Sequence, residues 1–382
     1  MTTVKMVKLG TLIKPAKLQK CGNDDYPVLS MTMHNGLVFQ SDKFKKSVAS
    51  QDKSTYKVVH RNQLVIGFPI DEGVLATQRI TDAGIVSPAY GIWDVDQTKI
   101  IPEFLEYALR CNRAIDYYKA KLRGSTARRR SLPTPTLLEL DVPLPDIEQQ
   151  KLALTTIHHA KNALDSRQAQ LTKLDELVKA RFVEMFGDKN YHYESLINLI
   201  LDGTSLSYGI VQPGNDGTGD MGVLRPVDIV DGKLTMSSIK YIDRSIGEGF
   251  KKTELDGDEL LITVRGTTGI TALTDGRFAG MNVTRGIAVI RYNRKKINPL
   301  YLNAYFNTDE SQRYIQEHTR GATLQQINLS DLRIQRIMLP PLSLQNQFAA
   351  FVAEVDKSKV EVQKALDQTQ LLFDSLMQQY FG

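Results

Sequence analysis

The residues of this 382-residue sequence that could do chemistry do not form a familiar catalytic motif. There is no GxxxxGK(S/T) phosphate loop, no HExxH zinc helix, no paired CxxC and no GxSxG nucleophile elbow. The adjacent pair His158-His159 falls in a predicted long helix, where neighbouring residues point to different faces, so we expect no metal site there. The sequence therefore predicts a chain with no catalytic site of its own.

Two partial motifs have simpler explanations than enzyme chemistry. Residues 214–219 (GNDGTG) are rich in glycine, but no strand-to-helix pattern surrounds them, which favours a flexible loop over a nucleotide cradle. Residues 298–301 (NPLY) are similar to the Asn-Pro-Pro-Tyr motif of amino-methyltransferases. Their counterpart at 101–104 (IPEF) keeps the proline and lacks the asparagine, so we interpret both as helix starts.

Basic side chains are concentrated in two runs that contain no acidic residue. The formal net charge is only +5, but residues 119–130 and residues 277–296 hold six basic residues each. Such runs predict local contact with an anionic partner. The two cysteines, Cys21 and Cys111, match no metal or redox spacing, so we expect free thiols in a reducing compartment. With no apolar run of about 20 residues to span a bilayer, we expect a cytoplasmic protein.

The second half of the chain repeats the first at a shift of about 196 residues. Residues 142–154 (VPLPDIEQQKLAL) match residues 338–350 (MLPPLSLQNQFAA), which places Gln149 over Gln345. Upstream, the RGST sequence that begins at Arg123 matches the RGAT sequence that begins at Arg320. The repeat predicts a tandem pair of strand-rich domains, each followed by a long helix.

Both long helices are expected to share an apolar seam. Each is predicted to run for about 40 residues, or about 60 Å, which is far longer than a globular core requires. Apolar residues recur every seven positions, although Arg167, Arg181 and Lys359 interrupt them. We therefore expect the helices to pair as an antiparallel coiled coil. The expected seam residues are Ile157, Leu164, Leu171, Val178 and Met185 in the first helix and Phe348, Val355, Val362, Leu366 and Phe373 in the second.

This layout resembles the specificity (S) subunits of type I restriction-modification systems, over essentially the whole chain. The resemblance is carried by LPDIEQQKLAL and LPPLSLQNQFAAF, the RGST and RGAT turns, and the Phe-Gly pair that closes each helix. It implies an α+β fold of four segments. These are a first target-recognition domain (1–140), a central conserved helix (141–187), a second target-recognition domain (188–336) and a distal conserved helix (337–382).

The resemblance also implies a function and partners. Each recognition domain would read one half of a bipartite, asymmetric site in double-stranded DNA, and the helix pair would set the spacing and dock two methyltransferase (M) subunits. Restriction-motor (R) subunits would join the full complex. No cofactor is expected in this chain, since S-adenosylmethionine, ATP and Mg²⁺ would belong to the partner subunits.

Candidate DNA contacts are basic or amide side chains on predicted surface loops, together with nearby hydroxyls. Gln325 and Gln326 suit contact with adenine, but capping of the following helix is an equal alternative. The full set is Lys121, Arg123, Ser125, Thr126, Arg128, Arg129, Arg130, Tyr208, Arg265, Thr267, Thr268, Arg285, Arg320, Thr323, Gln325 and Gln326.

Two other classes of protein remain open from the sequence. The chain could be a DNA methyltransferase or nuclease component in its own right, which the missing catalytic motifs count against. It could also be a coiled-coil interaction protein without a DNA role, whose affinity for DNA would barely depend on salt.

Overall fold

The computed structural model describes residues 4–33, 35–43, 52–122, 132–187, 190–214, 217, 219–322 and 324–382. The chain forms two compact units, which we call the first unit (Met1–Gln168 with Lys364–Gly382) and the second unit (Ala169–Gln363). Each unit combines one strand-rich part of the chain with half of each long helix. The four segments expected from the sequence stay a prediction, and each unit contains parts of both expected helices.

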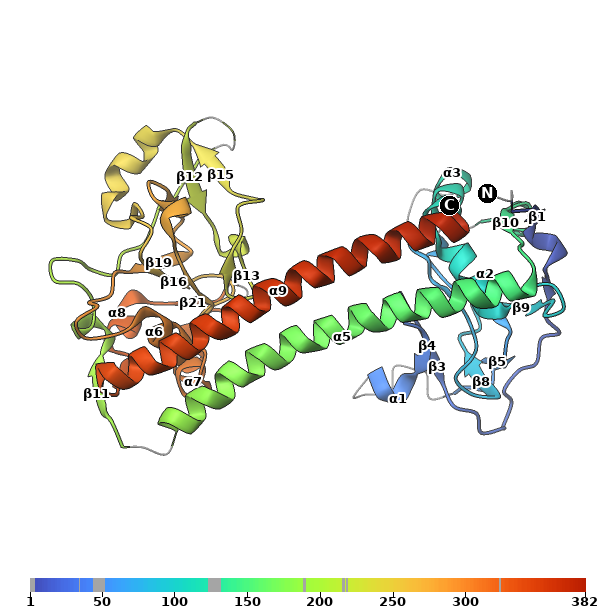
Figure 1. Cartoon of the computed structure of the whole chain (residues 1–382), viewed down its shortest axis with the longest axis horizontal. Coiled ribbons are helices and arrows are strands. Elements are labelled where there is room, and N and C mark those ends of the chain that lie inside the picture. Colours follow the sequence, from blue (N-terminus) through green and yellow to red (C-terminus); the bar gives the residue numbers. More distant parts are fainter. Residues whose placement is uncertain are drawn as a thin grey trace. The chain divides into compact units, whose positions relative to one another are not determined.

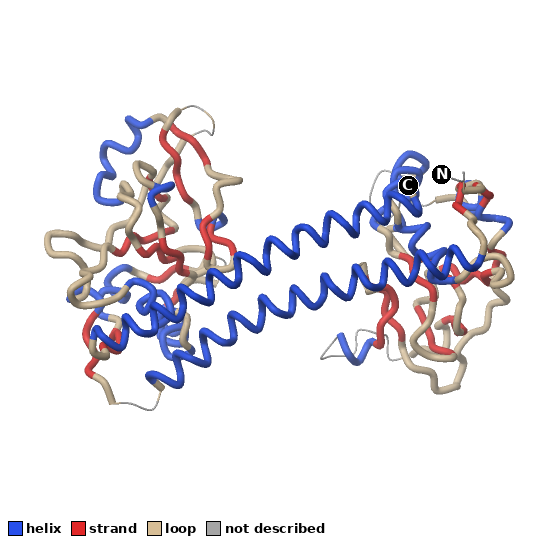
Figure 2. The backbone as a smooth tube through the Cα atoms, in the orientation of Figure 1, coloured by secondary structure: helices blue, strands red, loops and turns tan. Residues whose placement is uncertain are grey.

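The first unit is organised by an antiparallel sheet of order β2–β9–β6–β7. Its strands are short and rich in branched apolar residues, and long stretches of loop separate them (Figure 2). The elements are β1 (Met6–Lys8), β2 (Ile13–Pro15), β3 (Leu29–Thr32), β4 (Gly36–Phe39), α1 (Gln40–Lys43), β5 (Lys57–His60), β6 (Leu64–Ile66), β7 (Leu75–Thr77), β8 (Ala83–Val86), β9 (Gly91–Val95), α2 (Pro102–Arg110), α3 (Asn112–Lys121), α4 (Thr134–Leu138) and β10 (Asp141–Pro143).

The second unit repeats this plan with the antiparallel sheet β17–β16–β19. A further sheet, β15–β12–β18, contains a parallel pair between β12 and β18. The elements are β11 (His192–Ser195), β12 (Met221–Leu224), β13 (Ile229–Val230), β14 (Lys233–Leu234), β15 (Lys240–Ile242), β16 (Leu260–Thr263), β17 (Thr271–Leu273), β18 (Asn282–Val283), β19 (Ile287–Ile290), α6 (Pro299–Phe306), α7 (Asp309–His318), β20 (Thr319–Arg320), β21 (Gln326–Ile327), α8 (Leu329–Ile334) and β22 (Arg336–Leu339).

Corresponding strands make corresponding pairs in the two units. β6 pairs with β7 and β9, as β16 pairs with β17 and β19. The first strand of each unit pairs with the strand that leads into a long helix, since β1 pairs with β10 and β11 pairs with β22. The tandem, strand-rich α+β architecture predicted from the sequence repeat is thus confirmed.

The long helices are α5 (Ile147–Phe186) and α9 (Leu342–Phe381), of 40 residues each. In the first unit, Phe381 at the end of α9 joins the core cluster that contains Ala153 and Ile157 near the start of α5. In the second unit, Phe186 at the end of α5 lies 5.7 Å, between ring centroids, from Phe348 near the start of α9. Both long helices are labelled in Figure 1. Within each unit the helices therefore run antiparallel.

The expected seam residues are all buried or half-buried. Ile157, Phe348 and Val355 are buried, and the other seam positions are partly covered. Two of the cations that interrupt the seam have partners there: Lys359 Nζ lies 2.7 Å from Asp175 Oδ1, and the Arg181 guanidinium lies 5.7 Å from the centre of the Phe351 ring. The Lys359 side chain is only 14% exposed and its charge is paired, whereas the Arg181 guanidinium stacks on an aromatic ring.

The repeat register expected at the helix starts is wrong by one residue. The side chain of Gln150, rather than Gln149, corresponds to Gln345: its Oε1 accepts from Ile101 N at 2.8 Å, and Gln345 Oε1 accepts from Asn298 N at 2.9 Å. Both amides are completely buried. An approximate match of Pro, Gln and Ala could not locate the one-residue gap, because the neighbouring residues Gln149 and Gln150 look alike in sequence.

No helix in the described part of the chain is both long and apolar enough to cross a membrane. Cys21 and Cys111 are both buried and form no disulfide.

Candidate nucleic-acid interface

Several predicted DNA contacts of the second unit meet where its strands end. Main-chain hydrogen bonds tie these segments together: Gly266 N donates to Gln325 O (2.8 Å), Val264 N to Gly286 O (2.8 Å), and Arg285 N to Ile210 O (2.9 Å). We call this surface the reading end and define it as residues 208–210, 225–227, 264–268, 284–286 and 324–326.

Two arginines of the reading end have no acidic partner. Arg285 is exposed and Arg265 is half-buried, and neither guanidinium has a hydrogen-bond acceptor or a carboxylate within the described residues. Tyr208 is 37% exposed, and its hydroxyl accepts weakly from Leu329 N at 3.4 Å. Cations without internal partners beside an exposed aromatic ring suit contact with phosphates and bases.

The threonines and glutamines of this set occupy the same loops. Thr267 and Gln325 are exposed, and the Thr268 hydroxyl lies 3.0 Å from that of Thr319. Gln326 belongs to β21, and Asn328 is the residue at the N-cap of α8, so neither glutamine caps that helix. Thr323 lies outside the described residues.

Arg320 is placed differently from the other candidates. It is exposed on β20, and its Nη2 lies 3.6 Å from Asp331 Oδ2. This ion pair keeps the guanidinium near α8 and leaves it only partly available to another anion.

Most arginines of the basic run 277–296 are held by acidic neighbours. Arg277 donates to both carboxylate oxygens of Asp275, which lowers the pKa of that carboxyl group. Arg294 Nε donates to Asp258 Oδ2 at 3.0 Å and likewise lowers the pKa of Asp258, while burial raises the pKa of Tyr292, whose hydroxyl also contacts Asp258. The run is therefore not one continuous anion-binding surface, and Arg285 is its arginine without such a partner among the described residues.

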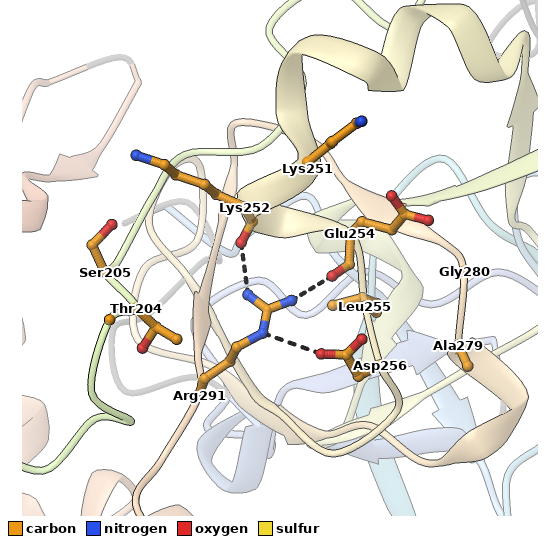
Figure 3. Close-up of a pocket in the computed structure, with 11 residues that line it drawn as sticks. Thr204, Ser205, Lys251, Lys252, Glu254, Leu255, Asp256, Ala279, Gly280 and Arg291 are labelled. Atoms are coloured by element: carbon orange, nitrogen blue, oxygen red, sulfur yellow. Dashed lines mark hydrogen bonds and ion pairs between the residues drawn. The ribbon is translucent and has the colours of Figure 1, made fainter.

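Arg291 of the same run has a structural role. Its Nη1 donates to Lys252 O at 2.6 Å, another nitrogen donates to Glu254 O, and its Nε lies 3.5 Å from Asp256 Oδ2 (Figure 3). It lines a cavity of about 580 Å³ with Thr204, but its donors face the loop at 252–256. Arg291 thus binds the loop at 252–256, so its guanidinium is not free to bind DNA.

A family model described as the type I restriction modification DNA specificity domain matches residues 218–369. The specificity subunit of the type I restriction enzyme EcoBI from Escherichia coli is 22% identical over 400 residues, which cover 91% of this chain and 82% of that protein. Residues 218–369 thus match the type I DNA specificity domain, and the chain as a whole is similar to a type I specificity subunit.

Solved structures agree on the fold. The S subunit of a type I restriction-modification system from M. genitalium matches with a TM-score of 0.57 at 12% identity, over 100% of this chain and 97% of that one. A chain from a structural study of type I complex assembly and conformational transition matches with a TM-score of 0.59 at 16% identity, over 99% and 97%. The fold of this chain is therefore the fold of these solved structures.

The candidate contacts of the first unit are described only at Lys121, which is exposed at the end of α3. Arg123, Ser125, Thr126, Arg128, Arg129 and Arg130 lie outside the described residues. The hairpin β6–β7 corresponds to β16–β17, which carries Arg265, but it presents Phe68 and Glu72 as exposed residues. The two units of this chain thus differ in chemistry at corresponding loops.

Two other motifs weighed from the sequence, the NPLY segment and His158, have structural partners. Asn298 Oδ1 accepts from Leu300 N at 3.0 Å and Pro299 opens α6, so the NPLY segment starts a helix as expected. His158 Nε2 lies 2.9 Å from Glu103 Oε1, and no group of three metal-ligating side chains occurs in the described residues.

Sequence reasoning missed the turn that follows β12. Residues Pro226–Asp228 form a short 3-10 turn, and Pro226 lies so close to Gly286 that a Cβ there would meet its Cγ at 2.7 Å. This places the turn in the reading end. The Arg-Pro-x-Asp spacing at 225–228 was the available signal, since an acid three residues after a turn start can bind its main-chain nitrogens.

Proposed function

We propose that this chain is the DNA-reading subunit of a type I restriction-modification complex and that each unit reads one half of a split, asymmetric sequence. The observation that carries this proposal is the reading end of the second unit, where Arg265 and Arg285 lie on adjoining loops without internal partners. Phosphate contacts by such arginines fix the position of a protein on DNA, and base contacts from the same loops select the sequence.

The tandem repeat supports two reading heads rather than one. Corresponding strands recur in both units, but the hairpin tips differ, with Arg265 in the second unit and Phe68 in the first. Heads that share a scaffold and differ in their loops are suited to unlike half-sites. The 40-residue helices, each about 60 Å long, provide a stiffer spacer than a flexible linker would.

In this proposal the chain supplies recognition without catalysis. Two methyltransferase subunits would dock on the outward faces of the long helices, use S-adenosylmethionine, and methylate adenine within the site. Restriction-motor subunits that require ATP and Mg²⁺ would complete a cleaving complex. The two alternatives predict otherwise. A methyltransferase in its own right would transfer methyl groups without a partner, and a coiled-coil interaction protein would have a DNA affinity that salt barely changes.

The deciding experiment is to purify the chain together with the methyltransferase encoded beside it and to sequence the methylated adenines of DNA treated with the complex. We expect one split, asymmetric motif. Replacing residues 188–336 with those of another specificity subunit should change one half of the motif and leave the other half unchanged. Methylation at a continuous motif, or a motif indifferent to the exchange, would contradict the proposal.

A further inference from the structure

The turn at Pro226–Asp228 holds an apolar side chain out of the protein on a rigid support. Val227 is 66% exposed, whereas its neighbour Asp228 is completely buried. The Asp228 carboxylate accepts from Arg225 N at 2.7 Å, from Arg225 Nε at 3.2 Å and from Ser238 Oγ at 2.6 Å. A buried carboxylate with this many donors fixes the turn, so Val227 is displayed in one position.

Neighbouring segments place Val227 in the reading end. The Pro226 ring packs against Gly286, the residue after Arg285, and an added Cβ at Gly286 would lie 3.8 Å from the carbonyl oxygen of Arg265. Thr284 N donates to Leu224 O at 2.9 Å, which joins the end of β12 to the same loop. Val227 therefore follows a proline that packs on the loop of Arg285, and the segment of Arg265 adjoins that loop.

Exposed apolar residues are common in this unit, Val230 among them, but Val227 lies on a braced turn in the reading end and can offer DNA an apolar contact. It adds nothing to the core, and its turn is braced by polar groups that would be unnecessary for a solvated loop. If the flanking arginines bind phosphates, the apolar group that a duplex offers in the major groove is the C5-methyl of thymine. Cytosine, adenine and guanine present no methyl group there.

We propose that Val227 is a specificity-determining residue that contacts a thymine methyl group in the half-site read by the second unit. The inference rests on the proposed function, because it assumes that the reading end faces DNA. It goes further in naming the base chemistry and the side chain that recognises it.

The test uses duplexes in which deoxyuridine replaces thymidine at one position at a time, so that a single methyl group is removed without any change to the protein. Binding of the complex of chain and methyltransferase is measured by fluorescence anisotropy. For the wild type, we expect deoxyuridine at one position in the second unit's half-site to weaken binding about fourfold, because burial of one methyl group is lost. For Val227→Ala, the same substitution should change binding less than about twofold.

Val230→Ala is the matched control, because Val230 is 54% exposed on the adjoining strand β13 and lies outside the reading end. This variant should respond to deoxyuridine as the wild type does. Three outcomes would overturn the inference and leave the proposed function standing. The wild type could bind selectively and show no deoxyuridine effect, Val227→Ala could show the same deoxyuridine effect as the wild type, or the half-site could contain no T·A pair. A Val227→Ala variant that loses the methyltransferase but keeps its base preference would assign the residue to a protein interface and would also overturn it. No sequence-selective binding by the wild type would overturn the proposed function, and the inference with it.

Discussion

At the level of single residues, the arginines of the second unit divide by whether a carboxylate lies beside them. Arg277 and Arg294 are matched to Asp275 and Asp258, and these pairs lower the pKa of each carboxyl group. Arg285 has no such partner within the described residues. A carboxylate beside an arginine weakens its attraction to a phosphate, whereas an arginine without one can bind a phosphate and release a counterion.

This difference predicts unequal salt dependence for two arginine variants. Arg285→Ala should lower the slope of log affinity against log salt by about 1, because one phosphate contact is lost. Arg277→Ala, the matched control, should leave the slope unchanged, because Arg277 is already neutralised by Asp275. A salt series of binding isotherms with the assembled complex measures both slopes. Equal reductions would mean that Arg277 also faces DNA.

A second residue-level prediction concerns the support of the Val227 turn. Asp228→Ala removes the acceptor of Arg225 N, the Arg225 guanidinium and the Ser238 hydroxyl at a completely buried site. We expect the free energy of unfolding of the second unit to fall by about 2–3 kcal/mol, because buried donors lose their partner. Urea denaturation followed by circular dichroism measures the change.

Asp220→Ala is the control for that measurement. The Asp220 side chain is 74% exposed, and its carboxylate lies 3.4 Å from Arg244, a geometry that contributes little to stability. We expect a change within about 0.5 kcal/mol. If the Asp228 variant were as stable as this one, the turn would not depend on its buried carboxylate.

At the level of elements, the long helices were the part of the fold most accessible from sequence. Apolar residues every seven positions and a Phe-Gly pair predicted α5 and α9 and their pairing, because helix periodicity is a local signal. The one-residue error at Gln150 arose because its burial depends on a tertiary contact, the N–H of Ile101 at the start of α2. That contact cannot be predicted from the local sequence.

The same limit applies to the candidate site. Arg265, Arg285 and Gln325 were predicted one by one from loop signals, and the strand ends bring their segments together. The contribution of the Pro226–Asp228 turn was missed, since its position depends on the fit of Pro226 against Gly286. The acidic partner of Arg294, Asp258, lies 36 residues away in sequence and could not be inferred from the basic run alone.

The corrected register gives an element-level prediction with a control at the neighbouring residue. Gln150→Ala and Gln345→Ala should each lower the free energy of unfolding by about 1–3 kcal/mol, because each leaves a main-chain N–H at a helix start without its acceptor. The exposed neighbours Gln149 and Gln347 should tolerate alanine within about 0.5 kcal/mol. Urea denaturation of the four variants distinguishes the two registers. If Gln149→Ala were as unstable as Gln150→Ala, the register expected from the sequence, with Gln149 over Gln345, would be supported.

At the level of the whole molecule, each unit contains the start of one long helix and the end of the other. The first unit holds the start of α5 and the end of α9, and the second unit holds the start of α9 and the end of α5. In the second unit the end of α5 at Phe186 leads directly to β11, which begins at His192. In the first unit the corresponding step, from Phe381 to β1, crosses between the two chain ends (Figure 1).

Contacts in the first unit place these two ends on one patch. Arg113 donates from Nε to Phe381 O at 3.2 Å and from Nη1 to Asp141 O at 2.7 Å, and Asp141 pairs with Lys8 of β1. A short loop could therefore join the end of α9 to β1, as residues 187–191 join α5 to β11. We therefore expect the fold not to depend on which of the two junctions is open.

A circular permutant tests this equivalence. Joining Gly382 to Val4 through about three Gly/Ser residues, and opening the chain between Gly187 and Asn190, should give a protein that assembles with the methyltransferase and methylates the same motif, because no helix or strand of the described residues is cut. The control opens the chain between Gln168 and Ala169, inside α5, where the break removes consecutive helical hydrogen bonds and should lower Tm strongly. Calorimetry and sequencing of methylated DNA give both readouts, and a first permutant as unstable as the control would show that the two junctions are not equivalent.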